Sequence, residues 1–171
     1  ENLEANRLNF RQTLFNASAM KDYIGGVILF DETIRQNTAQ GLSFPDYLEQ
    51  IGIIPGIKVD AGAKSFSCHP NEKITEGLDN LPQRMEEYKS LGAKFAKWRA
   101  VITIGDDIPS TACMIANSHA LARYASICQE VDIVPIVEPE VLMEGSHDIG
   151  KCFDVTNTAQ SILFEELELR K

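Results

Sequence analysis

The sequence predicts an α/β fold built around a parallel sheet. Four short apolar runs, at residues 24–30, 53–60, 93–104 and 132–141, are each followed by a segment with helical periodicity. No proline- or glycine-rich linker interrupts this alternation, so we expect residues 1–171 to form a single domain. Strict alternation of strands and helices implies parallel strands joined by right-handed crossovers. Two architectures fit this pattern: a small doubly wound sheet, or part of a β/α barrel.

The four apolar runs have the character of buried parallel strands. Residues 24–30 are continuously apolar and too short for a buried helix. Continuous apolar character, as opposed to alternation, is typical of a parallel strand whose outer face is covered by helices. The other three runs share this character and carry charged residues.

Helical periodicity fills the segments around these strands. Leu3, Phe10 and Leu14 fall on one face of an amphipathic first helix. Gly92 is a stop signal for a helix, and Pro109 lies near the start of another, where proline is tolerated. Helices are therefore expected over roughly residues 1–15, 44–50, 78–91, 109–130 and 147–170.

The composition excludes some classes of partner. The chain has 171 residues, 44% of them hydrophobic and 24% charged, which is enough to build a core at this length. Its net charge of −9 argues against a nucleic-acid partner, which requires a basic surface. The same charge does not exclude a small phosphorylated substrate, because such binding depends on local charge.

The cysteines and the apolar stretches bear on location. Cys68, Cys113, Cys128 and Cys152 form no CxxC pair and are expected to be reduced core thiols. No apolar stretch approaches the roughly 20 residues of a membrane span, and no signal peptide is visible. We therefore expect a cytoplasmic protein without a membrane partner. Because the chain begins at Glu1 inside a helical pattern, we expect it to be processed or truncated.

Three of the four strands carry a pair of charges separated by one residue. Strand positions i and i+2 point to the same face, so each strand sends two ionic groups in one direction. One such pair is most simply a strand end emerging into solvent, but three in successive repeats predict a single, mutually compensated site. In a barrel, this site lies at the C-terminal ends of the strands. The pairs are Lys58 with Asp60, Lys97 with Arg99, and Glu138 with Glu140.

Other signals of chemistry are weak. His69, His119 and His147 lack metal-ligand spacing, so no metal site is predicted. No phosphate-binding glycine loop and no nucleophile elbow is present. Trp98 is expected to pack in the core. Pro139 cannot donate to a sheet ladder and is expected near a strand end or at a bulge.

Several strings resemble the class I (Schiff-base) fructose-bisphosphate aldolases, in that family's order and spacing. They extend over essentially the whole chain: IGGVILF (24–30), GIKVD (56–60), FAKWR (95–99), LARYA (121–125) and IVPIVEPE (133–140). The resemblance implies a (β/α)8 TIM barrel, of which about four βα units, a half-barrel, are present. It also implies reversible cleavage of fructose 1,6-bisphosphate to dihydroxyacetone phosphate and glyceraldehyde 3-phosphate in glycolysis and gluconeogenesis. A metal-independent mechanism without cofactor and a homotetramer are implied as well.

The resemblance also implies roles for the charged pairs. Lys97 matches a lysine that assists proton transfer during bond cleavage, and Glu138 matches the acid and base of Schiff-base formation. Glu140 matches a neighbour that helps to hold the lysines. Two cations, Lys58 and Arg99, match residues near a substrate phosphate. Asp60 is expected to be a partner for these cations.

The motif that carries the family's Schiff-base lysine has no match in this sequence. A complete barrel has eight strands and about 250 residues, whereas four strands are counted here. We therefore expect the activity to belong to a longer protein and this chain alone to be inactive. Two alternatives remain: an inactive aldolase-derived fragment that acts as an association module, and an enzyme that uses Lys97 as the nucleophile. A zinc-dependent class II aldolase is disfavoured by the lack of histidine ligands.

Overall fold

A computed structural model describes residues 3–170. Its main sheet has four parallel strands in the order β1-β2-β5-β6, so each strand lies beside the strand of this sheet that follows it along the chain. In a doubly wound sheet the strand order changes direction at one point, and no such change occurs among these four strands. The structure therefore corresponds to a segment of a barrel. The strands are β1 (Gly26–Leu29), β2 (Ile54–Lys58), β5 (Phe95–Ile102) and β6 (Val134–Val141).

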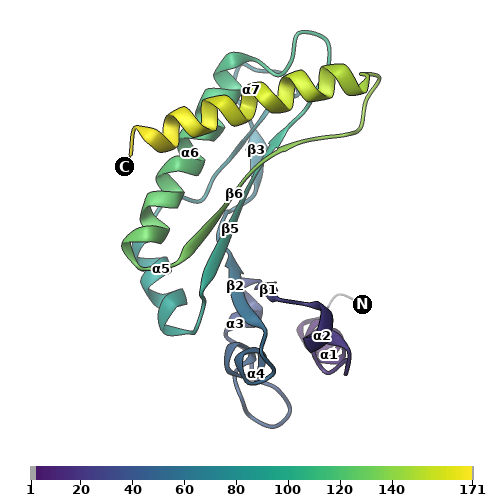
Figure 1. Cartoon of the computed structure of the whole chain (residues 1–171), viewed down its shortest axis with the longest axis vertical. Helices are drawn as coiled ribbons and strands as arrows, with labels where there is room; N and C mark the ends of the chain where they lie inside the picture. Colours follow the sequence, from purple (N-terminus) through teal and green to yellow (C-terminus); the bar gives the residue numbers. More distant parts are fainter. Residues whose placement is uncertain (1–2, 171) are drawn as a thin grey trace.

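Seven helices are found among the described residues, and α5, α6 and α7 lie on a single side of β5 and β6. Figure 1 shows α5 and α6 along one side of β5 and β6, with α7 crossing near the far end of these strands. The helices are α1 (Glu4–Phe15), α2 (Met20–Tyr23), α3 (Asp31–Ile34), α4 (Phe44–Gln50), α5 (Leu81–Ser90), α6 (Thr111–Glu130) and α7 (Ile149–Glu168). The five predicted helices are confirmed, while the short α2 and α3 were not predicted.

Polar side chains fix where the long helices begin. Ser110 accepts a hydrogen bond from Cys113 N at 3.1 Å, and Asp148 accepts one from Lys151 N at 2.8 Å. The helix expected from Pro109 therefore begins at Thr111, with the proline just before the cap.

A small antiparallel sheet follows β2 and was not predicted. It pairs β3 (Ala63–Ser65) with β4 (Lys73–Thr75), and the two strands form a hairpin between β2 and α5. Both strands have only three residues and no clear alternation of polar and apolar positions. This hairpin contacts β5 beside the charged residues, where Thr75 Oγ1 donates to Arg99 O.

Residues of β5 alternate strictly between two environments. Ala96, Trp98, Ala100 and Ile102 are buried toward the helices, and Trp98 packs on Tyr124 of α6 with ring centroids 5.5 Å apart. The expected core role of Trp98 is confirmed. The odd-numbered residues of β5 point to the opposite face, away from α5, α6 and α7.

The opposite face is apolar at one end of the strands and charged at the other. Phe95 lies across the neighbouring strands, since a Cβ on Gly56 would come within 2.4 Å of its ring and one on Gly26 within 3.1 Å. Ile54 and Val134 are exposed beside it. The ionic residues follow at the C-terminal ends of the same strands.

Pro139 lies two residues before the end of β6, near the strand end as expected. Val134 N–H donates to the carbonyl of Lys94, just before β5, and Leu142 N–H, just after β6, donates to the carbonyl of Ile102, so even-numbered residues of β6 bond toward β5. Pro135 and Pro139 therefore occupy positions whose N–H would point to the outer edge, where its absence costs no ladder bond.

Helix α1 is confirmed, but its apolar face is not buried. Leu3, Phe10 and Leu14 are all about half exposed or more, and the buried residue of this helix is Phe15. The helix is held by Phe15 and Leu8, which pack in the core, and by ion pairs. Both Arg7 and Arg11 bind the carboxylate of Glu32 on α3, at 2.6 and 2.5 Å.

The cysteines of the described chain form no disulfide. Cys113 and Cys128 are buried, as expected for core thiols, whereas Cys68 is exposed in the β3–β4 loop, which corrects that expectation for this residue. Between residues 3 and 170, no helix has the length and apolar character needed to cross a membrane.

Candidate active site

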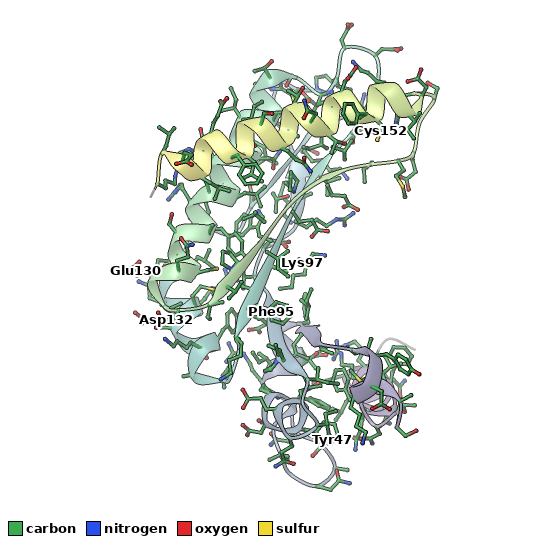
Figure 2. The ribbon with its side chains drawn as sticks, in the orientation of Figure 1. Tyr47, Phe95, Lys97, Glu130, Asp132 and Cys152 are labelled. Atoms are coloured by element: carbon green, nitrogen blue, oxygen red, sulfur yellow. The ribbon has the colours of Figure 1, made fainter. Side chains whose placement is uncertain are left out.

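The three charged pairs meet on one face at the C-terminal ends of the strands. Lys58 on β2 is the register partner of Lys97 on β5, and Arg99 is the register partner of Glu138 on β6. Register partners in a parallel sheet project to the same face. Figure 2 labels Lys97 and Phe95 on β5, on the side of the strand away from α6.

Each cation binds a carboxylate two positions further toward the strand ends. Lys97 lies opposite Ile136 but its Nζ is 2.9 Å from Glu138 Oε2, and Arg99 lies opposite Glu138 but binds Glu140. Side chains that stand on a sheet lean along the strand direction, which explains these diagonal contacts. The result is a ladder of ion pairs across the strand ends.

Lys97 and Glu138 form a close ion pair that leaves Glu138 Oε2 without a hydrogen bond from the described residues. Their side chains are 27% and 30% exposed, so they are shielded from bulk water without being enclosed. Glu138 Oε2 is itself buried and has no partner in hydrogen-bond geometry among the described residues, so the contact is an ion pair alone. A carboxylate oxygen in this state keeps a lone pair for a proton or a further donor.

Arg99 is held by the carboxylate of Glu140, which accepts a hydrogen bond from Arg99 Nε. This hydrogen bond raises the pKa of the Arg99 guanidinium above its ordinary value, against the smaller opposing effect of burial. The guanidinium is therefore charged throughout the physiological range and remains partly exposed. A planar cation of this kind binds phosphate or carboxylate oxygens in pairs.

Asp60 is the most deeply buried of the six ionic residues. Its side chain is 2% exposed and lies 2.5 Å from Lys58 Nζ. The same carboxylate also accepts hydrogen bonds from the backbone N–H groups of Gly62 and Arg99, at 3.0 and 3.3 Å. Asp60 therefore binds Lys58 and also joins the backbone after β2 to the backbone of β5. Its carboxylate is turned toward these groups and away from the open side of the sheet.

All six predicted residues are brought together, but the sequence did not reveal what supports them. Thr75 Oγ1 donates to Arg99 O at 2.8 Å, and Asn117 binds the backbone of β4. Arg84 of α5 donates to Val59 O at 2.6 Å, beside the β2 strand end. The buried carboxylate of Glu72 accepts hydrogen bonds from Ser110 N–H and from the Ser110 hydroxyl, both at 2.7 Å. These residues lie in segments read as a loop and as ordinary helix, where periodicity gives no signal.

His69 and His119 make their contacts outside this site. His69 stacks on Phe66 in the β3–β4 loop with ring centroids 4.0 Å apart, while His119 contacts Glu166 and Arg170 on the outer helices. Within residues 3–170, no group of three or more His, Cys, Asp or Glu side chains is arranged to hold a metal ion.

Comparison with known proteins accounts for this arrangement. A family model described as fructose-bisphosphate aldolase class-I matches residues 1–171. A probable fructose-bisphosphate aldolase class 1 from Xanthomonas axonopodis pv. citri is 58% identical over 167 residues, which are 98% of this chain and 50% of that protein. The cytosolic fructose-bisphosphate aldolase 4 of Arabidopsis thaliana is 47% identical over 98% of this chain and 42% of its own length.

A solved structure gives the same result in three dimensions. The fructose-bisphosphate aldolase of Plasmodium falciparum, in complex with TRAP and a small-molecule inhibitor, superposes with a TM-score of 0.94 at 43% identity. The match covers 98% of this chain and 49% of that one, so this chain spans about half the length of the relatives it matches. The partial β/α barrel is thereby confirmed, and the chain belongs to the class I fructose-bisphosphate aldolase family.

Proposed function

We propose that this chain forms half of the catalytic barrel of a Schiff-base aldolase. The reaction is the reversible cleavage of fructose 1,6-bisphosphate to dihydroxyacetone phosphate and glyceraldehyde 3-phosphate, in glycolysis and gluconeogenesis. The observation that carries the proposal is the ladder of ion pairs at the strand ends, in a chain of this family. Lysines and carboxylates in mutual contact are what imine chemistry requires, because water must be lost and regained through proton transfers.

Lys97 and Glu138 are the residues proposed to move protons. At 2.9 Å, the ammonium and the carboxylate can exchange a proton between them or with a substrate placed over both groups. The free lone pair of Glu138 Oε2 suits its proposed role as acid and base during Schiff-base formation and dehydration. Glu140 is proposed to hold the cations of the site in place, as it does for Arg99.

Lys58 and Arg99 are proposed to bind a substrate phosphate. Both are cations on the open face of the sheet, partly exposed and already oriented by a carboxylate. A phosphate approaching Arg99 meets donors that Glu140 does not use, because a guanidinium carries five N–H groups. Asp60 is proposed to orient Lys58 and to fix the adjoining end of β5.

The Schiff-base lysine is proposed to lie outside this sequence, in a longer protein. The relatives are about twice as long as this chain, and the family's lysine motif has no match in it. A homotetramer and a cytoplasmic location are proposed on the same grounds. Two plant relatives are named cytosolic or cytoplasmic, from Arabidopsis thaliana and Spinacia oleracea.

Trapping the imine tests the proposal. Two proteins are compared: this chain, of 19.0 kDa, and the longer protein proposed to contain it, called the natural-length protein. Both are incubated with dihydroxyacetone phosphate and borohydride, and their intact masses are measured. We expect one reduced adduct on the natural-length protein and none on this chain. Metal chelation is expected to leave the adduct unchanged.

Three other outcomes would contradict the proposal. No adduct on either protein would favour the inactive association module, which the exposed apolar face of the sheet already suits. An adduct on this chain that disappears in Lys97→Arg would make Lys97 the nucleophile. Loss of activity on chelation would indicate the metal-dependent mechanism.

A further inference from the structure

Strands β2 and β5 separate near the charged cluster, and side chains bind the backbone that is left there. Val59 N–H donates to Lys97 O at 3.1 Å, continuing the pairing of the two strands. At Arg99, two residues further along β5, side chains replace the β2 backbone. Asp60 Oδ2 accepts from Arg99 N at 3.3 Å, and Thr75 Oγ1 donates to Arg99 O at 2.8 Å.

Thr75 is itself held by Asn117 of α6. Thr75 N–H donates to Asn117 Oδ1 at 3.1 Å, and Asn117 Nδ2 donates to Lys73 O at 2.9 Å. The Asn117 side chain thus accepts a hydrogen bond from one backbone N–H of β4 and donates one to a backbone carbonyl of β4, as a neighbouring strand would. Thr75 is 2% and Asn117 1% exposed, and Asn117 Nδ2 also reaches Cys113 O at 3.0 Å within its own helix. The hydroxyl of Thr75 therefore has a fixed position.

We propose that Thr75, held by Asn117, is a positioning residue for Arg99. The hydroxyl of Thr75 binds the carbonyl of Arg99 on the side of β5 that β2 leaves, whereas the Arg99 guanidinium reaches the open face. The hydroxyl and the Asp60 carboxylate together fix both backbone groups of Arg99 and so fix where its side chain starts. The inference rests on the proposed function in taking Arg99 as a group that binds substrate phosphate.

Loss of this hydroxyl has a defined consequence. The Arg99 carbonyl would lose its partner on the side of β5 that β2 no longer covers, and β5, held there by β6 alone, would shift to find another. A displacement of about 1 Å at a substrate-positioning group is enough to weaken productive binding many-fold. The proton-transfer pair of Lys97 and Glu138 would be less affected, because the Lys97 carbonyl remains bonded to Val59 N–H, just after β2.

The test is Thr75→Val in the natural-length protein, with Thr75→Ser as the conservative variant. Valine keeps the shape of threonine without the hydroxyl, and serine retains the hydroxyl. For Thr75→Val we expect KM for fructose 1,6-bisphosphate and the dissociation constant of inorganic phosphate to rise about tenfold, with kcat changed less than about threefold. Thr75→Ser is expected to restore both constants.

Thr33→Val is the matched control. Thr33 is a buried threonine on α3 whose hydroxyl has no hydrogen-bond partner among the described residues, so its loss is expected to change neither constant. Equal constants for Thr75→Val and Thr33→Val would overturn the proposal. A fall in kcat with unchanged KM, or no restoration by serine, would do so as well.

Two complications have separate answers. If Thr75→Val does not fold, Thr75→Ala takes its place with Thr33→Ala as control, and the same difference in KM is expected. If the unchanged protein shows neither turnover nor a trapped imine, the proposed function fails. The phosphate dissociation constants of the same variants would still decide the role of Thr75.

Discussion

At the scale of single residues, each cation of the site is fixed by a carboxylate two positions further along the strands. Positions i and i+2 predicted which side chains share a face, and Lys58, Lys97 and Arg99 do face the same side with their carboxylates. Spacing could not predict which carboxylate each cation binds, because that depends on register and on the lean of the side chains. Nor could it reveal Thr75 and Asn117, whose importance arises only from tertiary contact.

The assignment of Lys97 and Glu138 leads to a prediction about turnover. Lys97→Met and Glu138→Gln each remove the charge on one side of the pair while retaining most of the side-chain volume. In the natural-length protein we expect kcat to fall by about 10²–10⁴-fold, the range typical of general acid–base groups, with KM changed far less. Steady-state kinetics on fructose 1,6-bisphosphate measure both constants.

Lys94→Met is the control for these variants. Lys94 lies just before β5 and forms an exposed ion pair with Glu49 at 3.0 Å, far from the charged strand ends. Such a surface pair contributes little to stability, so turnover is expected to remain unchanged. Unchanged turnover in both Lys97→Met and Glu138→Gln would remove these residues from the catalytic assignment.

At the scale of elements, period and continuity predicted the long helices and all four main strands but not the surroundings of each element. The apolar positions of α1 do share one face, yet that face is exposed, because periodicity identifies a face without identifying what covers it. The β3–β4 hairpin escaped because its strands are only three residues long. Short strands carry too few positions for a period of two to be recognised.

The attachment of α1 to α3 predicts a pH dependence of stability. Hydrogen bonds from Arg7 and then Arg11 lower the pKa of Glu32 to about 2, below its ordinary value near 4.5. A carboxylate with a lowered pKa in the folded state stabilises that state above its unfolded pKa, and this contribution is lost as the pH falls. For Glu32, the loss is expected between about pH 4.5 and 2.

Glu32→Gln isolates this contribution. Urea unfolding of the unchanged chain and of the variant is compared at pH 6 and pH 3, and we expect the stability gap between them to narrow at the lower pH. Glu165→Gln removes an exposed carboxylate on α7 and serves as control. A gap for Glu32→Gln that stays constant with pH would show that the arginine contacts do not persist in solution.

At the scale of the whole molecule, the order of the strands gave the architecture that pattern alone left open. Sequential parallel strands with the long helices on one side form a barrel segment, and its inner face bears the ionic cluster. The same geometry leaves apolar residues of that face in contact with water. Ile54 and Val134 are 52% and 66% exposed on either side of Phe95. Exposed apolar patches of this kind favour association.

We therefore predict that this chain associates through the open face of its sheet. The outer edge of β6 is a poorer candidate, because Pro135 and Pro139 remove N–H donors from it. Analytical ultracentrifugation over a range of concentrations is expected to show self-association, and Ile54→Lys with Val134→Lys to weaken it at least about tenfold. Phe164→Lys makes the same change at an exposed position on α7 and is expected to have no effect. A loss of association with Phe164→Lys alone would place the contact on the helical layer, and the open face of the sheet would then bind no second copy.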